Sequence, residues 1–90
     1  MLLKDLTLGT EIKVFYGGKD QGVETISSVD TDNNRFSIMY KGEEIYFGYS
    51  ESSGWRRISE NPLGEGWTFS QREEEYIFRV LPDDGELTVQ

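Results

Sequence analysis

The sequence predicts an all-β fold, a small antiparallel barrel or meander with a C-terminal β-hairpin or cap. Three observations support this prediction. The chain contains no alanine, the residue with the strongest helix propensity. Apolar side chains recur at every second position in several short segments, which is the spacing of a half-buried strand. Gly, Asn and Asp separate these segments at intervals of about 8–12 residues, as in small all-β domains.

The first two strands are predicted from different patterns. Residues 11–16 alternate between apolar and polar side chains, and a turn at GGKDQG follows them. Residues 23–29, VETISSV, are rich in β-branched side chains, but their apolar positions are three apart. Because a strand repeats every two residues, this spacing predicts a bulge or sharp bend near Ser27 and Ser28.

Two further strands are predicted at residues 35–41 and 44–50, which a tight Lys-Gly-Glu turn joins. In the second of these strands Tyr46 lies on the face opposite to Phe47 and Tyr49. A short strand is predicted at WRRIS, and the Gly- and Pro-containing segment ENPLGEG predicts a loop.

The C-terminal third fits two structures. Ser70 followed three residues later by Glu73 is a capping-box pattern, which favours a helical turn at 70–74. The segment YIFRV is aromatic and β-branched, which favours a strand over 75–81. A last strand is predicted at ELTVQ. Whether residues 60–90 complete the barrel or stand apart from it stays open at this point.

Several chemistries are excluded by composition. The chain has no cysteine and no histidine, so it has no disulfide, thiol nucleophile, histidine base or Cys/His zinc site. The start MLLKDLTLGT has a charge by position 4, so we expect no secretory signal there, and no run approaches the ~18 apolar residues of a membrane span. The absence of cysteine fits a reducing compartment, and we expect a cytoplasmic protein.

Two motif-like stretches fail on physical grounds. Asp30 begins a calcium-loop pattern, but Arg35 stands where the sharp turn needs glycine and Lys41 where a bidentate glutamate is needed. Gly48 begins a nucleophile-elbow pattern, but Ser52 stands at its final glycine position. We therefore expect no metal, no cofactor and no catalytic residues, and predict that the protein is not an enzyme.

The net charge of −8 is concentrated near the C-terminus. Residues 60–90 hold eight acids and two arginines (−6), and the first 59 residues hold nine acids and seven bases (−2). Such a chain repels nucleic acid and anionic membranes and is attracted to basic protein surfaces. Solubility is an alternative reason for the charge. The predicted partner-binding acids are Glu60, Glu65, Glu73, Glu74, Glu75, Asp83, Asp84 and Glu86.

Two aromatic residues are predicted to be exposed and to add to this partner-binding set. Tyr46 faces outward by alternation, and Trp55 stands beside the only adjacent pair of arginines in the chain. Trp and Arg are the residues that most often anchor protein interfaces. Most of the aromatic residues between 40 and 57 are expected in the core.

The stretch from Gly9 to Tyr16, the bend near Ser27 and the turn after Tyr40 together resemble the layout of SH3-like small barrels, and within them the Tudor-like group. The resemblance covers residues 6–59, so 60–90 would be an acidic extension of a single domain, residues 1–90. It implies an alternative aromatic site, formed by Tyr16, Tyr40 and Phe47, that binds a cationic or arginine-rich peptide.

Two binding functions follow. The first is occlusion of a protein with a basic surface, such as one that binds nucleic acid, by the acidic surface, without direct contact to nucleic acid. In size and charge the chain resembles small phage inhibitors of bacterial defence systems, including anti-CRISPR proteins, which would make it a nucleic-acid mimic. The second is a reader or scaffold module that uses the aromatic site. The sequence favours no particular oligomeric state.

Overall fold

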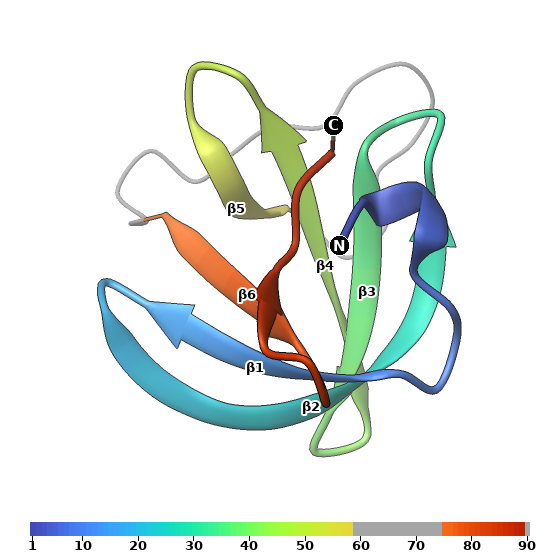
Figure 1. Cartoon of the computed structure of the whole chain (residues 1–90), viewed down its shortest axis with the longest axis vertical. Coiled ribbons are helices and arrows are strands. Elements are labelled where there is room, and N and C mark those ends of the chain that lie inside the picture. The colour runs from blue at the N-terminus through green and yellow to red at the C-terminus, as the bar shows by residue number, and fades with distance from the viewer. Residues whose placement is uncertain (59–74, 90) are drawn as a thin grey trace.

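The structure, a computed structural model, describes residues 1–58 and 75–89. Within these ranges the strands form one antiparallel sheet in chain order, and pairing of the first strand with the sixth closes it into a barrel (Figure 1). The predicted fold class, a small all-β barrel, is confirmed. The strands are β1 (Glu11–Tyr16), β2 (Lys19–Asp30), β3 (Arg35–Tyr40), β4 (Glu43–Ser50), β5 (Gly54–Ile58), β6 (Tyr76–Val80) and β7 (Gly85–Glu86).

The first hairpin has a shorter turn than GGKDQG predicted. Gly17 and Gly18 have φ angles of 58° and 81°, and they alone connect Tyr16 to its partner Lys19. A two-residue turn with two positive φ angles matches the twist of a hairpin, and glycine adopts such angles without strain. β2 therefore starts at Lys19, four residues before the strand predicted at 23–29.

The predicted irregularity in β2 is confirmed. The register between β2 and β3 shifts between Ile26 and Ser28, where the apolar spacing departs from two. The DTDNN segment then forms the turn that connects these strands. In it the Asp30 carboxylate accepts hydrogen bonds from the Asn33 amide at 2.9 Å and from Arg35 Nε at 2.7 Å.

The tail residues Tyr76–Val80 form a strand, β6, and this strand belongs to the barrel. It pairs with β1 along its whole length, from Tyr16 opposite Tyr76 to Ile12 opposite Val80. β7 then adds to β6 as the second arm of a hairpin, but only Gly85 and Glu86 are in strand conformation. The helical turn considered at 70–74 lies outside the described residues.

Trp55 is part of the core, so the prediction that it is exposed is wrong. Its side chain is 3 % exposed, and its indole N–H donates to the Leu87 carbonyl at 3.2 Å. The physical reason is its register. Trp55 lies opposite Tyr49 on the inner face of the β4–β5 pair, where its ring packs edge-on against Phe36 and Phe78 at 5.1 and 5.7 Å.

The chain termini cover one end of the barrel. The Leu3 N–H donates to the Thr88 carbonyl at 2.7 Å, and the Thr88 N–H donates to the Met1 carbonyl at 2.9 Å. Leu3 in the 3₁₀ turn η1 (Leu3–Asp5), Leu6 and Leu87 are buried in the same cluster as the barrel core. Leu2 and Thr88 form a parallel bridge, so the first residues of the chain and the segment after β7 lie side by side (Figure 1). Among the described residues, no helix has the length and apolar character that would let it cross a membrane.

Candidate functional site

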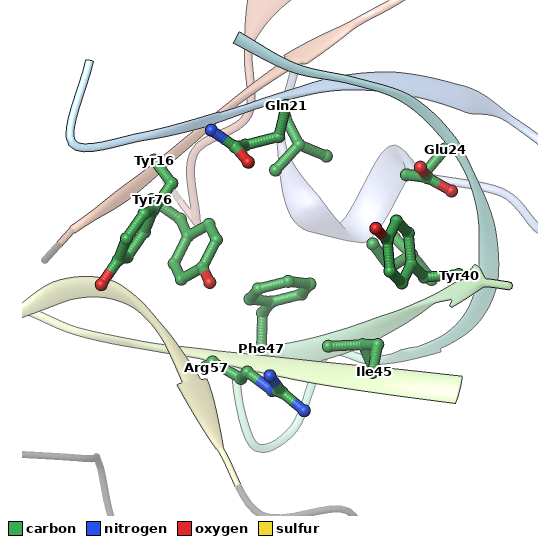
Figure 2. A pocket seen from close by; sticks show the side chains of 10 residues that line it. Tyr16, Gln21, Glu24, Tyr40, Ile45, Phe47, Arg57 and Tyr76 are labelled. Atoms are coloured by element: carbon green, nitrogen blue, oxygen red, sulfur yellow. The ribbon is translucent and has the colours of Figure 1, made fainter. Parts of the chain in front are cut away.

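The other end of the barrel holds a cavity. The last residues of β1 and β3 meet the first residues of β2 and β4 at this end, and Tyr76, the first residue of β6, lies opposite Tyr16. The cavity has a volume of about 170 Å³ and opens to solvent (Figure 2). Its buried lining is apolar and consists of Val14, Ile38, Ile45 and Phe47.

Three tyrosines and Phe47 provide the aromatic surface of this cavity. Tyr16 and Tyr76 lie side by side with ring centroids 4.6 Å apart, and Phe47 packs edge-on against Tyr76 at 4.8 Å. Tyr40 lies on the opposite side of the cavity from this pair, as Figure 2 shows. The structure therefore brings together Tyr16, Tyr40 and Phe47, the three residues of the alternative aromatic site.

Tyr40 differs from the other two in its exposure. The alternation of β3 puts it on the inner face with Phe36 and Ile38, which are buried, but Tyr40 itself is 43 % exposed. It is the last residue of β3, so its ring lies at the open rim of the barrel, where the Lys41 ammonium group stands 5.3 Å from the ring centroid.

Two opposite charges also border the cavity. Glu24 comes from β2, and Arg57 comes from β5, where it lies opposite Phe47 in the register and so shares its inward face. Within the described part of the chain, neither group makes an ion pair or a side-chain hydrogen bond. The Gln21 amide lies nearby and donates to the Lys19 carbonyl at 3.2 Å. Figure 2 shows Glu24 and Arg57 on different walls.

The size and lining of the cavity limit what it can hold. Pockets for drug-sized ligands measure roughly 300–1,000 Å³, whereas a cavity of ~150 Å³ holds a benzene molecule. At about 170 Å³ this cavity takes one side chain or a group of similar size. Aromatic rings attract cations through their faces. Among residues 1–58 and 75–89, no group of three acidic side chains lies close enough to hold a metal ion.

Tyr46 faces outward, but its hydroxyl group is already used. It donates to the Glu44 carboxylate at 2.6 Å, and Ser37 and Ser27 donate to the same carboxylate at 2.7 and 3.1 Å. The hydrogen bonds from Ser37 and Tyr46 hold the pKa of Glu44 below its ordinary value. This cluster lies on the outer face of β2, β3 and β4, and it satisfies the hydroxyl of Ser37, which is fully buried.

The predicted acidic site is only partly within the described residues, and those members lie apart. Glu75 directly precedes β6, at the cavity end, whereas Asp83 and Asp84 follow the other end of this strand. Glu86 lies close to these two, and all four are exposed. Glu60, Glu65, Glu73 and Glu74 lie outside the described residues.

Four polar or aromatic residues of the cavity lining, Gln21, Glu24, Arg57 and Tyr76, are not among the site residues that the sequence predicts. Tyr76 had a usable signal, because it alternates with the apolar Phe78 and Val80 and so shares their inner face. Glu24 and Arg57 have no such signal in the sequence. A charged side chain on the inner face of a strand is tolerated only near an open end of the barrel, because the closed interior excludes charge. The sequence does not show where that end lies. Gln21 belongs to the part of β2 for which the sequence predicts a turn.

A comparison of the chain with protein-family models, with curated proteins and with solved structures finds no match.

Proposed function

We propose that this protein is a binding module that takes one cationic side chain of a partner protein into the aromatic cavity. The observation that carries this proposal is the arrangement of Tyr16, Tyr40 and Phe47 around a cavity the size of one side chain. Tyr76 extends the aromatic surface, and Glu24 supplies a carboxylate at the wall.

The binding energy would come from ring faces and from one charge. A cation over an aromatic ring is stabilised by about 0.5–2 kcal/mol, more when water is excluded. The Glu24 carboxylate adds an attraction that is stronger beside apolar walls than in bulk water. The net charge of −8 acts at longer range, because it steers a basic partner toward the protein and raises the association rate.

A titration with Nα-acetyl-Nε-trimethyllysine amide, followed by NMR, tests the proposal. We expect shifts at the cavity residues, and we expect Tyr40→Ala to weaken binding about tenfold, since the lost ring contact is worth roughly 1.4 kcal/mol. Met39→Ala is the matched control: Met39 is 45 % exposed and precedes Tyr40 in β3, but points to the opposite face. No shift in the native protein with this amide or with its free acid, or equal affinity in a folded Tyr40→Ala variant, would refute the proposal.

A second candidate is occlusion of a basic protein surface, and the net charge of −8 favours it. Asp83, Asp84 and Glu86 are exposed and near one another, and they would take the place of phosphates. In this case the protein would act as a nucleic-acid mimic, for example as an anti-CRISPR inhibitor of a bacterial defence system.

The two candidates differ in which variant loses the partner. A variant with Asp83→Asn, Asp84→Asn and Glu86→Gln should lose a nucleic-acid-binding partner if occlusion is correct, whereas Tyr40→Ala should retain it. The opposite pattern supports the cavity. The substitution by Asn suits Asp84, whose φ angle of 62° lies in the left-handed region that Asn tolerates.

A further inference from the structure

The positive charge of Arg57 disfavours a ligand that carries only a positive charge. It is exposed at the mouth of the cavity, its register with Phe47 turns its side chain to the inner face, and it carries a permanent positive charge. A cation that enters beside Arg57 is repelled, and the apolar walls strengthen the repulsion relative to bulk water. A ligand that carries only a cation therefore leaves the charge of Arg57 uncompensated.

We propose that the ligand is dipolar: next to its cationic side chain it carries a carboxylate, which Arg57 binds. This inference rests on the proposed function of the cavity and names the class of ligand. Glu24 and the tyrosine rings face the cation, and the Arg57 guanidinium faces the carboxylate. A planar guanidinium matches a carboxylate with two parallel hydrogen bonds, which gives direction as well as affinity.

The availability of the two charged groups supports this assignment. Within the described part of the chain, Arg57 and Glu24 have no ionic or side-chain hydrogen-bonding partner, and they border the same cavity from β5 and β2. Figure 2 shows them on different walls with the aromatic rings between. The neighbouring Arg56 is different, because its Nε already donates to the Ser53 carbonyl at 3.0 Å.

The carboxylate has two sources in a peptide: the C-terminal carboxyl group of the cationic residue, or an acidic side chain that follows it. Two matched pairs of probes distinguish them. The first pair is Nα-acetyl-Nε-trimethyllysine as the free acid and as the amide. The second pair places glutamate or glutamine after acetylated trimethyllysine, with both C-termini amidated. Each pair keeps the cation constant and changes only the carboxylate.

We expect the acid of at least one pair to bind about tenfold more tightly than its neutral partner, the gain typical of a charge-assisted hydrogen bond. Arg57→Gln should abolish this difference. Arg56→Gln is the control and should keep it. Glu24→Gln should weaken acid and neutral probes by the same factor, because its carboxylate faces only the cation.

The outcomes separate the two proposals. If no probe causes shifts at the cavity residues, the proposed function is wrong. If the amides bind as tightly as the acids in both pairs, the cavity binds a simple cation and the dipolar ligand is refuted. The dipolar ligand is also refuted if the preference for the acid persists in a folded Arg57→Gln variant.

Discussion

Glu44 shows how a single carboxylate organises the outer face of this small barrel. Ser37, Tyr46 and Ser27 all donate hydrogen bonds to it, and Ser37 is the one buried polar residue in the described core. These bonds favour the ionised form, so the pKa of Glu44 lies below its ordinary value of 4.5. A carboxyl group whose pKa is lowered by folding stabilises the protein above its unfolded pKa. That contribution is lost as the pH falls through the folded value.

Glu44→Gln should therefore lower the free energy of unfolding at pH 7 by about 1 kcal/mol, since a charged acceptor of several hydrogen bonds becomes neutral. The loss should shrink as the pH falls below 4.5, because the native protein then loses the same contribution. Urea denaturation between pH 3 and 7 measures both. Glu43→Gln removes the same charge from an exposed neighbour and is the matched control, which should not show this loss at pH 7. A Glu44→Gln penalty that is constant with pH would contradict the assignment.

Single residues mark the limit of what the sequence predicts. Tyr46 and Trp55 were both expected on the surface, and only Tyr46 faces outward. The alternation around Tyr46 extends over a full strand, so its face is defined. Trp55 is the second residue of a five-residue strand next to two arginines, and its face depends on pairing with Tyr49. That register is a tertiary property, and local polarity indicated the wrong face.

At the level of elements, β6 decides whether the sheet is open or closed. Phe78 at its centre is fully buried and contacts Phe36, Phe47 and Trp55 with ring centroids 4.9, 4.8 and 5.7 Å apart. Its strand neighbour Ile77 points outward and is 37 % exposed. The two adjacent residues therefore differ in role, although both are large and apolar.

Phe78→Ala should lower the free energy of unfolding by about 3–5 kcal/mol, the cost of a cavity left by a buried aromatic ring. Ile77→Ala should cost less than about 1 kcal/mol, because its side chain is partly solvated in the folded state. Chemical denaturation of both variants gives the comparison. Similar small costs would mean that β6 is only loosely attached to the barrel, and would contradict the pairing with β1.

The positions of the strands were more predictable from the sequence than the pairing between them. β1 matches residues 11–16, and the bulge after Ile26 was indicated by the spacing of apolar residues, because both features are local. The pairing of β1 with β6 joins residues that are at least sixty positions apart in the chain, and no local pattern specifies it. The cavity follows from this closure. Its aromatic members were named from a resemblance to known barrels, whereas its charged members appear only when the barrel is assembled.

At the scale of the whole molecule, the main feature is the excess of acidic over basic side chains. The chain has 17 acids against 9 bases, and in the described ranges Arg35 and Asp30 form the one ion pair. Most of the acids within residues 1–58 and 75–89 therefore lack a compensating partner there, and their mutual repulsion destabilises the compact state. The repulsion acts between exposed groups, so dissolved salt screens it within a Debye length of about 10 Å at 0.1 M.

Sodium chloride should therefore raise the melting temperature at pH 7, by a few degrees between about 10 and 200 mM, where screening changes most. Thermal unfolding followed by circular dichroism measures this shift. The variant with Asp83→Asn and Glu86→Gln should respond less to salt, because two of the exposed acids are gone. A melting temperature independent of salt in the native protein would show that repulsion is negligible.

Binding to a basic partner should respond to salt in the opposite direction, since the same screening removes electrostatic steering. One salt series should thus stabilise the free protein while slowing association with its partner.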